Sequence, residues 1–142
     1  MAKKKITQKV REQVKQRAKG YCEYCFYPEA YANQFYSIEH IIPLSKNGTD
    51  NLDNLAYACQ CCNGHKYNKT HAIDAISGKK VAIFHPRKDN WEKHFCWSDD
   101  YLRIEGLSAT GRVTVELLDL NRDSLIRLRT VLFAFGEHPP KR

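Results

Sequence analysis

The chain has 142 residues, of which 42% are hydrophobic and 27% charged, a composition typical of one globular domain with room for a small appended lobe. Its net charge of +7 favours a polyanionic partner, because neutralised phosphates release counterions; the alternative is a basic surface that only keeps the protein soluble. No run approaches the about 18 apolar residues of a membrane span, and the start "MAKKKITQKV" lacks the apolar stretch of a signal peptide. We therefore expect a cytoplasmic protein without membrane contact, whose six cysteines stay reduced.

The first predicted element is a helix over residues 6–19. Apolar residues recur at every fourth position from Ile6 to Ala18, and Gly20 follows as a natural stop. The remaining faces are strongly basic, and they are either solvated or lie along a phosphate backbone. In the second case, the predicted nucleic-acid contacts of this helix are Lys9, Lys15 and Lys19.

Two C-x-x-C pairs follow, separated by 33 residues. Such a pair can bring two thiolates to one ion, and two pairs supply the four ligands of a tetrahedral structural zinc. Disulfides or four buried thiols are the alternatives, and a reducing compartment disfavours disulfides. The predicted zinc ligands are Cys22, Cys25, Cys59 and Cys62. Cys61 lies between two of them, and we expect its side chain to point away from the ion.

The segment between the pairs predicts a strand and a loop. "FYSIEHI" alternates as a strand does, which places Ser37 and Glu39 on one face and His40 on the other. Pro43 ends this strand, and "SKNGTDNLDN" has the composition of a loop. A short helix is compatible with the residues from Asn63 onward.

The character of the sequence changes after Gly78. "YLRIEGL" indicates a strand, whereas "RVTVELLDL" fits either a strand or a helix. "NRDSLIRLRTVLFAF" indicates a helix with Asn121 as its N-cap. The predicted apolar face of that helix contains Leu125, Leu128, Leu132 and Phe135.

"CEYC" and "EHIIPLSKNGTDNLDNLAYACQCCNGHK" together resemble the zinc-knuckle variant of the HNH endonucleases, which have a ββα-metal core. The shared pattern is an acidic residue before His, then Ile-x-Pro, a Gly-containing loop, Asn-Leu and C-x-x-C-Asn-x-x-Lys. The downstream pieces "FHPR", "HF", "IEGLSATGR" and "LNR" resemble an extension of bacterial members. The resemblance therefore covers residues 10–129.

The resemblance implies a role for each motif residue. It implies that His40 is the general base and that Glu39 and Asn63 hold a catalytic divalent ion, Mg²⁺ or Mn²⁺. Glu39 stands where Asp is more usual, which keeps the carboxylate but lengthens the ligand. Asn54, counted with the catalytic residues, is expected to stabilise the loop between two strands. Two further residues, His65 and Lys66, are expected to extend toward phosphate oxygens.

We therefore expect an α+β fold with a small zinc-stapled ββα-metal (HNH/His-Me finger) core and an N-terminal helix at residues 1–78. A C-terminal helical extension at residues 79–142 is expected to pack on this core. The expected function is metal-dependent hydrolysis of phosphodiester bonds in DNA rather than RNA, by a monomer or a dimer. The alternatives are a non-catalytic zinc-dependent nucleic-acid-binding module, which needs no base such as His40, and a zinc-stabilised protein-interaction module, which the positive charge disfavours.

Overall fold

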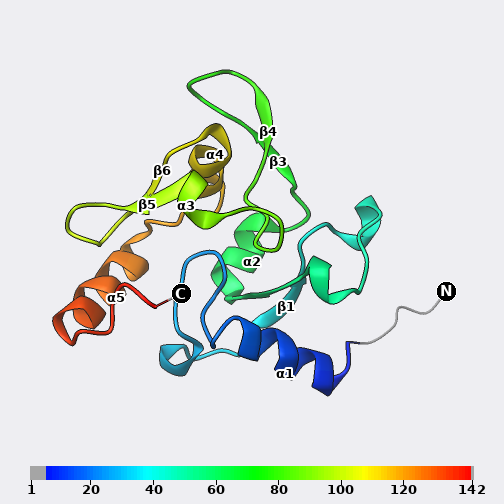
Figure 1. The fold of residues 1–142 in the computed structure, drawn as a ribbon, viewed down its shortest axis with the longest axis horizontal. Coiled ribbons are helices and arrows are strands. Elements are labelled where there is room, and N and C mark those ends of the chain that lie inside the picture. Colours follow the sequence, from blue (N-terminus) through cyan, green and yellow to red (C-terminus); the bar gives the residue numbers. More distant parts are fainter. Residues whose placement is uncertain (1–5, 142) are drawn as a thin grey trace. The chain divides into compact units, whose positions relative to one another are not determined.

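The computed structural model describes residues 6–141 and divides the chain into two compact units, with the boundary between Asn68 and Lys69 (Figure 1). The first unit contains α1 (Gln8–Arg17), β1 (Ser37–His40), β2 (Leu55–Ala58) and α2 (Gln60–Lys66). The second contains β3 (His71–Ile73), β4 (Lys80–Ala82), α3 (Trp91–His94), β5 (Phe95–Trp97), β6 (Ile104–Gly106), α4 (Ala109–Leu117) and α5 (Asp123–Ala134). The strands form three antiparallel pairs, β1-β2, β3-β4 and β5-β6, so the predicted α+β class is confirmed.

Helix α1 confirms the apolar stripe predicted at the start of the chain. Thr7 caps it, because its hydroxyl accepts a hydrogen bond from the Val10 amide at 3.2 Å. Val14 is completely buried in the middle of the helix. At the other end, the Arg17 guanidinium donates to the Leu52 and Leu55 carbonyls at 2.9 and 2.6 Å, which ties the helix to the start of β2.

The unit boundary lies ten residues before the position expected from the sequence. Gly78, with φ of 71°, is a turn residue in the β3-β4 hairpin rather than the start of a new segment. Within this hairpin, the buried Asp74 accepts a bidentate pair of hydrogen bonds from Arg112 of α4, at 3.0 and 2.9 Å. The hairpin therefore belongs to the second unit, and the arginine holds the pKa of the Asp74 carboxyl below its usual range.

The segment "RVTVELLDL", whose pattern fitted either a strand or a helix, forms most of helix α4. Ser108 caps the helix by accepting a hydrogen bond from the Gly111 amide at 3.0 Å. Gly106 and Gly111 let β6 and α4 approach closely, because a Cβ on Gly106 would lie 2.5 Å from the Arg112 nitrogen. Aromatic rings pack in the interior of the second unit. The rings of Phe84 and Phe95 pack edge to face, with their centroids 5.2 Å apart.

Helix α5 is present as predicted, but two details were wrong. Asn121 is not the N-cap, because its side-chain amide bonds to both backbone groups of Ile104 in β6, at 2.8 and 2.9 Å. Phe135 does not extend the buried face, since the helix ends at Ala134 and Phe135 is 78% exposed. Leu125 and Leu132 are buried as expected. Among residues 6–141, no helix has both the length and the apolar character needed to cross a bilayer.

The substitution Gly111→Ala should destabilise the second unit. The added Cβ would overlap the backbone carbonyl oxygen of His94, which is held by a hydrogen bond from the Leu107 amide at 2.8 Å. We expect a loss of about 1–3 kcal/mol in the free energy of unfolding, measured by denaturant titration. Gly64→Ala in α2 is the matched control, because nothing lies within 4 Å of its added Cβ. An equal loss in both variants would contradict the close-approach explanation.

Candidate functional site

Four cysteines gather in the interior of the first unit. The sulfur atoms of Cys22, Cys25, Cys59 and Cys62 all lie within 4.8 Å of one another, and all four residues are buried. Within the described part of the chain, they are the only group of three or more His, Cys, Asp or Glu side chains arranged to hold a metal ion. The sequence therefore predicted the membership of this cluster correctly.

Local hydrogen bonds shape both halves of the cluster. In the first, the Phe26 amide donates to the Cys22 carbonyl at 2.9 Å, and Phe26 takes the left-handed φ of 63°. Glu23 anchors this turn to β2, because its carboxylate accepts from the Tyr57 amide at 2.8 Å. In the second, Cys59 caps α2 through a bond from the Cys62 amide to its sulfur, at 3.4 Å.

The geometry of the cluster fits a structural zinc ion. The Cys25 and Cys59 sulfurs are 3.7 Å apart, and tetrahedral Zn–S bonds of about 2.3 Å would separate two sulfurs by about 3.8 Å. None of the six cysteines forms a disulfide. Hydrogen bonds from the other three thiols, Cys22 first, lower the pKa of Cys59, so the cluster favours a thiolate. Cys61 is exposed and lies outside the cluster.

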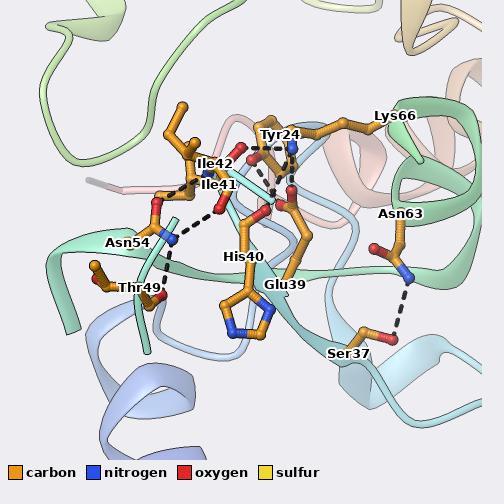
Figure 2. A network of polar contacts seen from close by, with 10 residues as sticks. All are labelled: Tyr24, Ser37, Glu39, His40, Ile41, Ile42, Thr49, Asn54, Asn63 and Lys66. Carbon is orange, nitrogen blue, oxygen red and sulfur yellow. Dashed lines mark hydrogen bonds and ion pairs between the residues drawn. The ribbon is translucent and has the colours of Figure 1, made fainter. Parts of the chain in front are cut away.

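The cluster is continuous with a ββα unit. Strands β1 and β2 pair in the register Ser37–Ala58 to His40–Leu55, and β2 runs directly into α2 through Cys59. Because Cys59 and Cys62 are fixed in the cluster, the first turn of α2 is fixed as well. Asn63 follows Cys62 directly, and its side chain points toward β1. Its side-chain amide nitrogen lies 3.5 Å from the Ser37 hydroxyl (Figure 2).

Asn54 closes the loop that joins the two strands. Its side-chain oxygen accepts from the Ile42 amide at 2.9 Å, and its amide nitrogen donates to the Ile42 and Thr49 carbonyls at 2.9 and 2.8 Å (Figure 2). Gly48 allows this closure, because any Cβ there would overlap the Ile42 carbonyl oxygen. Asn54 thus holds both sides of the loop, the position in which the resemblance put a loop-stabilising residue.

Glu39 points into the unit and is only 5% exposed. One carboxylate oxygen accepts from the Tyr24 hydroxyl at 2.7 Å, and the other pairs with the Lys66 ammonium group (Figure 2). Burial raises the pKa of Glu39, and the charge of Lys66 opposes this rise. Burial also raises the pKa of Tyr24, which keeps its hydroxyl group protonated and able to donate.

Lys66 is therefore not the phosphate contact that the sequence suggested. Its side chain is 1% exposed, and its ammonium group also donates to the Ile41 carbonyl at 2.8 Å and to the His40 carbonyl at 3.4 Å. Desolvating a lysine is costly unless a carboxylate and acceptors surround it, and Glu39 and these carbonyls do so. Lys66 consequently joins the end of α2 to the end of β1.

His40 lies on the opposite face of β1 from Glu39, as the alternation predicts (Figure 2). Its side chain is 24% exposed, and its Nε2 atom lies 2.7 Å from an oxygen of Asp50. Asp50 could not be identified from the sequence, because the composition of the loop does not distinguish it from Asp53. Only the folded path of the loop brings one of these aspartates to the imidazole.

The other predicted nucleic-acid contacts lie on the surface of the first unit. Lys9, Lys19 and His65 are exposed. Lys15 is also exposed, but it forms an ion pair with Glu29 at 2.9 Å, so part of its charge is already neutralised. Lys9 and Lys19 are thus the better candidates on and just after α1.

Similarity to known proteins falls on the same segment as the cysteine cluster and the ββα unit. A family model described as HNH endonuclease matches residues 22–69, which include both cysteine pairs and the ββα unit. The chain is also 27% identical over 96 residues to the Septu protein PtuA of Bacillus mycoides (strain KBAB4). That match covers 63% of this chain and 13% of the Septu protein. No solved structure matches the chain significantly.

The cysteine cluster predicts one zinc ion per chain. Cys59→Ser removes a ligand from the cluster and should release the zinc and unfold the first unit, because metal-binding energy contributes directly to folding. Cys61→Ser is the matched control and should keep the zinc, since Cys61 lies outside the cluster. Elemental analysis and circular dichroism measure both effects. Loss of zinc from the Cys61 variant alone would reject this ligand assignment.

The substitution Lys66→Met should make stability depend strongly on pH. The raised pKa of Glu39 means that the folded protein binds its proton more tightly than the unfolded chain, so stability falls as pH rises from the ordinary glutamate value to the folded one. Without Lys66 this pKa rises further, so we expect a loss of about 3–5 kcal/mol near neutral pH that shrinks on acidification. Urea unfolding at about pH 5 and about pH 8 measures the difference.

The control is the double variant Glu39→Gln/Lys66→Met. It leaves no uncompensated buried charge, so it should recover most of the loss at neutral pH. A pH-independent loss in the single variant would show that Glu39 finds another partner when Lys66 is absent.

Proposed function

Because residues 22–69 carry an HNH endonuclease domain, we propose that the protein is a metal-dependent endonuclease that hydrolyses phosphodiester bonds in DNA, with His40 as its general base. One observation carries this proposal. A partly exposed histidine stands at the end of β1, and a carboxylate oxygen lies 2.7 Å from its Nε2 atom. Purely structural histidines do not need this combination of access and orientation.

The base function rests on the second ring nitrogen. Asp50 occupies Nε2, and within residues 6–141 no group forms a hydrogen bond with Nδ1. A neutral imidazole can accept a proton from water at that nitrogen. The water oxygen then bonds to phosphorus, the bond from phosphorus to the 3′ oxygen breaks, and the departing oxygen takes a proton from solvent.

The residues proposed to hold the divalent ion are Glu39 and Asn63. Glu39 points from β1 toward Lys66 of α2, and Asn63 lies on α2 with its side-chain amide 3.5 Å from Ser37 of β1. Carboxylate and amide oxygens suit Mg²⁺ or Mn²⁺. Tyr24 and Lys66 take one lone-pair site on each Glu39 oxygen, and a carboxylate offers about four such sites. When bound, the ion would stabilise the negative charge of the phosphate and of the leaving oxygen.

Lys66 sets a condition on this ion. The lysine already compensates the Glu39 charge, so a cation arriving alone would gain little from the carboxylate. Mg²⁺ usually binds through one or two carboxylates together with substrate phosphates. The proposed site should therefore fill together with DNA rather than before it, and the exposed Lys9, Lys19 and His65 are candidates to hold the DNA backbone.

The alternative is a non-catalytic zinc-dependent nucleic-acid-binding module. The burial of Glu39 against Lys66 favours it, because a module without catalysis would keep this pair for structure alone. His40 favours the nuclease, since a binding module has no need for a base held by a carboxylate. Cleavage of DNA by the purified protein decides between these two functions.

The substitution His40→Ala should slow cleavage by about a hundredfold or more, the usual size of a general-base contribution. The variant keeps the four cysteines, so it should retain its zinc and its affinity for DNA. The experiment incubates wild type and variant with supercoiled plasmid in Mg²⁺, in Mn²⁺ and with a chelator, and follows nicked and linear products. His71→Ala is the matched control, because His71 is exposed and belongs to β3 of the second unit.

Two outcomes would contradict the proposal. DNA binding without cleavage by the wild type in either metal would favour the binding module. Undiminished cleavage by the His40 variant would assign the base function to another residue. A variant Asn63→Ala adds a separate test of the ion, because weakened metal binding should be partly overcome by high concentrations of Mn²⁺.

A further inference from the structure

We propose that Asp50 is the positioning residue of His40, which fixes the imidazole in the tautomer that leaves Nδ1 free to accept a proton. The catalytic consequence rests on the nuclease function proposed above, but the tautomer itself does not. The two residues are ten positions apart in sequence, one at the end of β1 and the other in the loop that follows. Their contact is a product of the loop fold.

The hydrogen bond determines the tautomer. Asp50 Oδ1 lies 2.7 Å from His40 Nε2, a normal length for a charge-assisted bond. An ionised carboxylate can only accept hydrogen bonds, so Nε2 must donate. In a neutral imidazole the other nitrogen, Nδ1, then carries the lone pair. Without Asp50, both tautomers and several ring rotations would be open to a side chain at the surface.

The loop holds the two partners at a fixed separation. The Asn54 amide bonds to Thr49, the neighbour of Asp50, and to Ile42, two residues beyond His40. Gly48 lets the same two parts of the backbone approach closely, as no side chain could fit there. One side-chain amide thus joins the backbone beside the acid to the backbone beside the base, which distinguishes this pair from an incidental surface contact.

The energetics also point to orientation rather than stability. The side chains of His40 and Asp50 are 24% and 35% exposed, and ion pairs with such access to water contribute little to folding. Removing the carboxylate should therefore leave the thermal midpoint almost unchanged. Asp53 provides a matched control, since it is an exposed aspartate in the same loop.

The first test is ¹⁵N NMR of the His40 ring in the zinc-loaded 142-residue chain without Mg²⁺ or DNA. The wild type should show a protonated Nε2 and an unprotonated Nδ1. In Asp50→Asn, the new amide group can donate to Nε2, so the ring should shift toward the tautomer protonated at Nδ1. Asp53→Asn should match the wild type, and Asp50→Glu should restore the original tautomer at least in part.

The second test is the kinetics of DNA cleavage. Asp50→Asn should lower kcat by at least about tenfold with little change in KM, because a misdirected base affects the chemical step rather than binding. Asp50→Glu should recover part of the loss. If the wild type fails to cleave, the proposed function is wrong while the NMR experiment still decides the pairing. An unchanged tautomer in Asp50→Asn would overturn the positioning role, whatever the kinetics show.

Discussion

Four thiol groups from two distant segments meet within 4.8 Å in the first unit, and the remaining structure of that unit depends on this meeting. Strands of four residues and a helix of seven are too short to be stable alone in water. A zinc ion bound by four cysteines can supply about 10–16 kcal/mol of folding energy. Because Cys59 directly follows β2 and caps α2, the cluster fixes the junction from which the helix projects its side chains toward β1.

Two consecutive residues of β1, Glu39 and His40, lie in different environments, one buried and the other partly exposed. Glu39 is buried, and its contacts with Tyr24 and Lys66 hold α2 against the strand. His40 faces the other way and keeps contact with solvent and with Asp50. The proposed ion site lies on the buried face of β1 with Glu39, and the proposed base His40 lies on the opposite face. A phosphate that contacts both must therefore sit at the end of the strand. The short β1, which ends at His40, leaves this end open.

Local spacing in the sequence predicted some features, but it could not predict which distant residues a side chain contacts in the fold. Two C-x-x-C pairs predict a shared ion from the chain itself, and the alternation of β1 predicts that Glu39 and His40 lie on opposite faces. Nothing in the sequence shows that Lys66 is buried, because its burial depends on Glu39 approaching from a strand 27 positions earlier. Asn121 illustrates the same limit, since its amide serves β6 rather than the helix that it precedes.

The loop between the strands fixes the orientation of the His40 side chain, as close packing in a hydrophobic core fixes a buried side chain. A general base must be reachable by water and phosphate, so it cannot be held by close packing on all sides. Asn54 and Gly48 instead fix the backbone on which Asp50 sits, and Asp50 holds the imidazole by one directional bond. The glycine and the asparagine of the loop therefore support the geometry of the proposed base through the backbone alone. In so small a unit, hydrogen bonds orient a side chain that burial would close off from the proposed substrate.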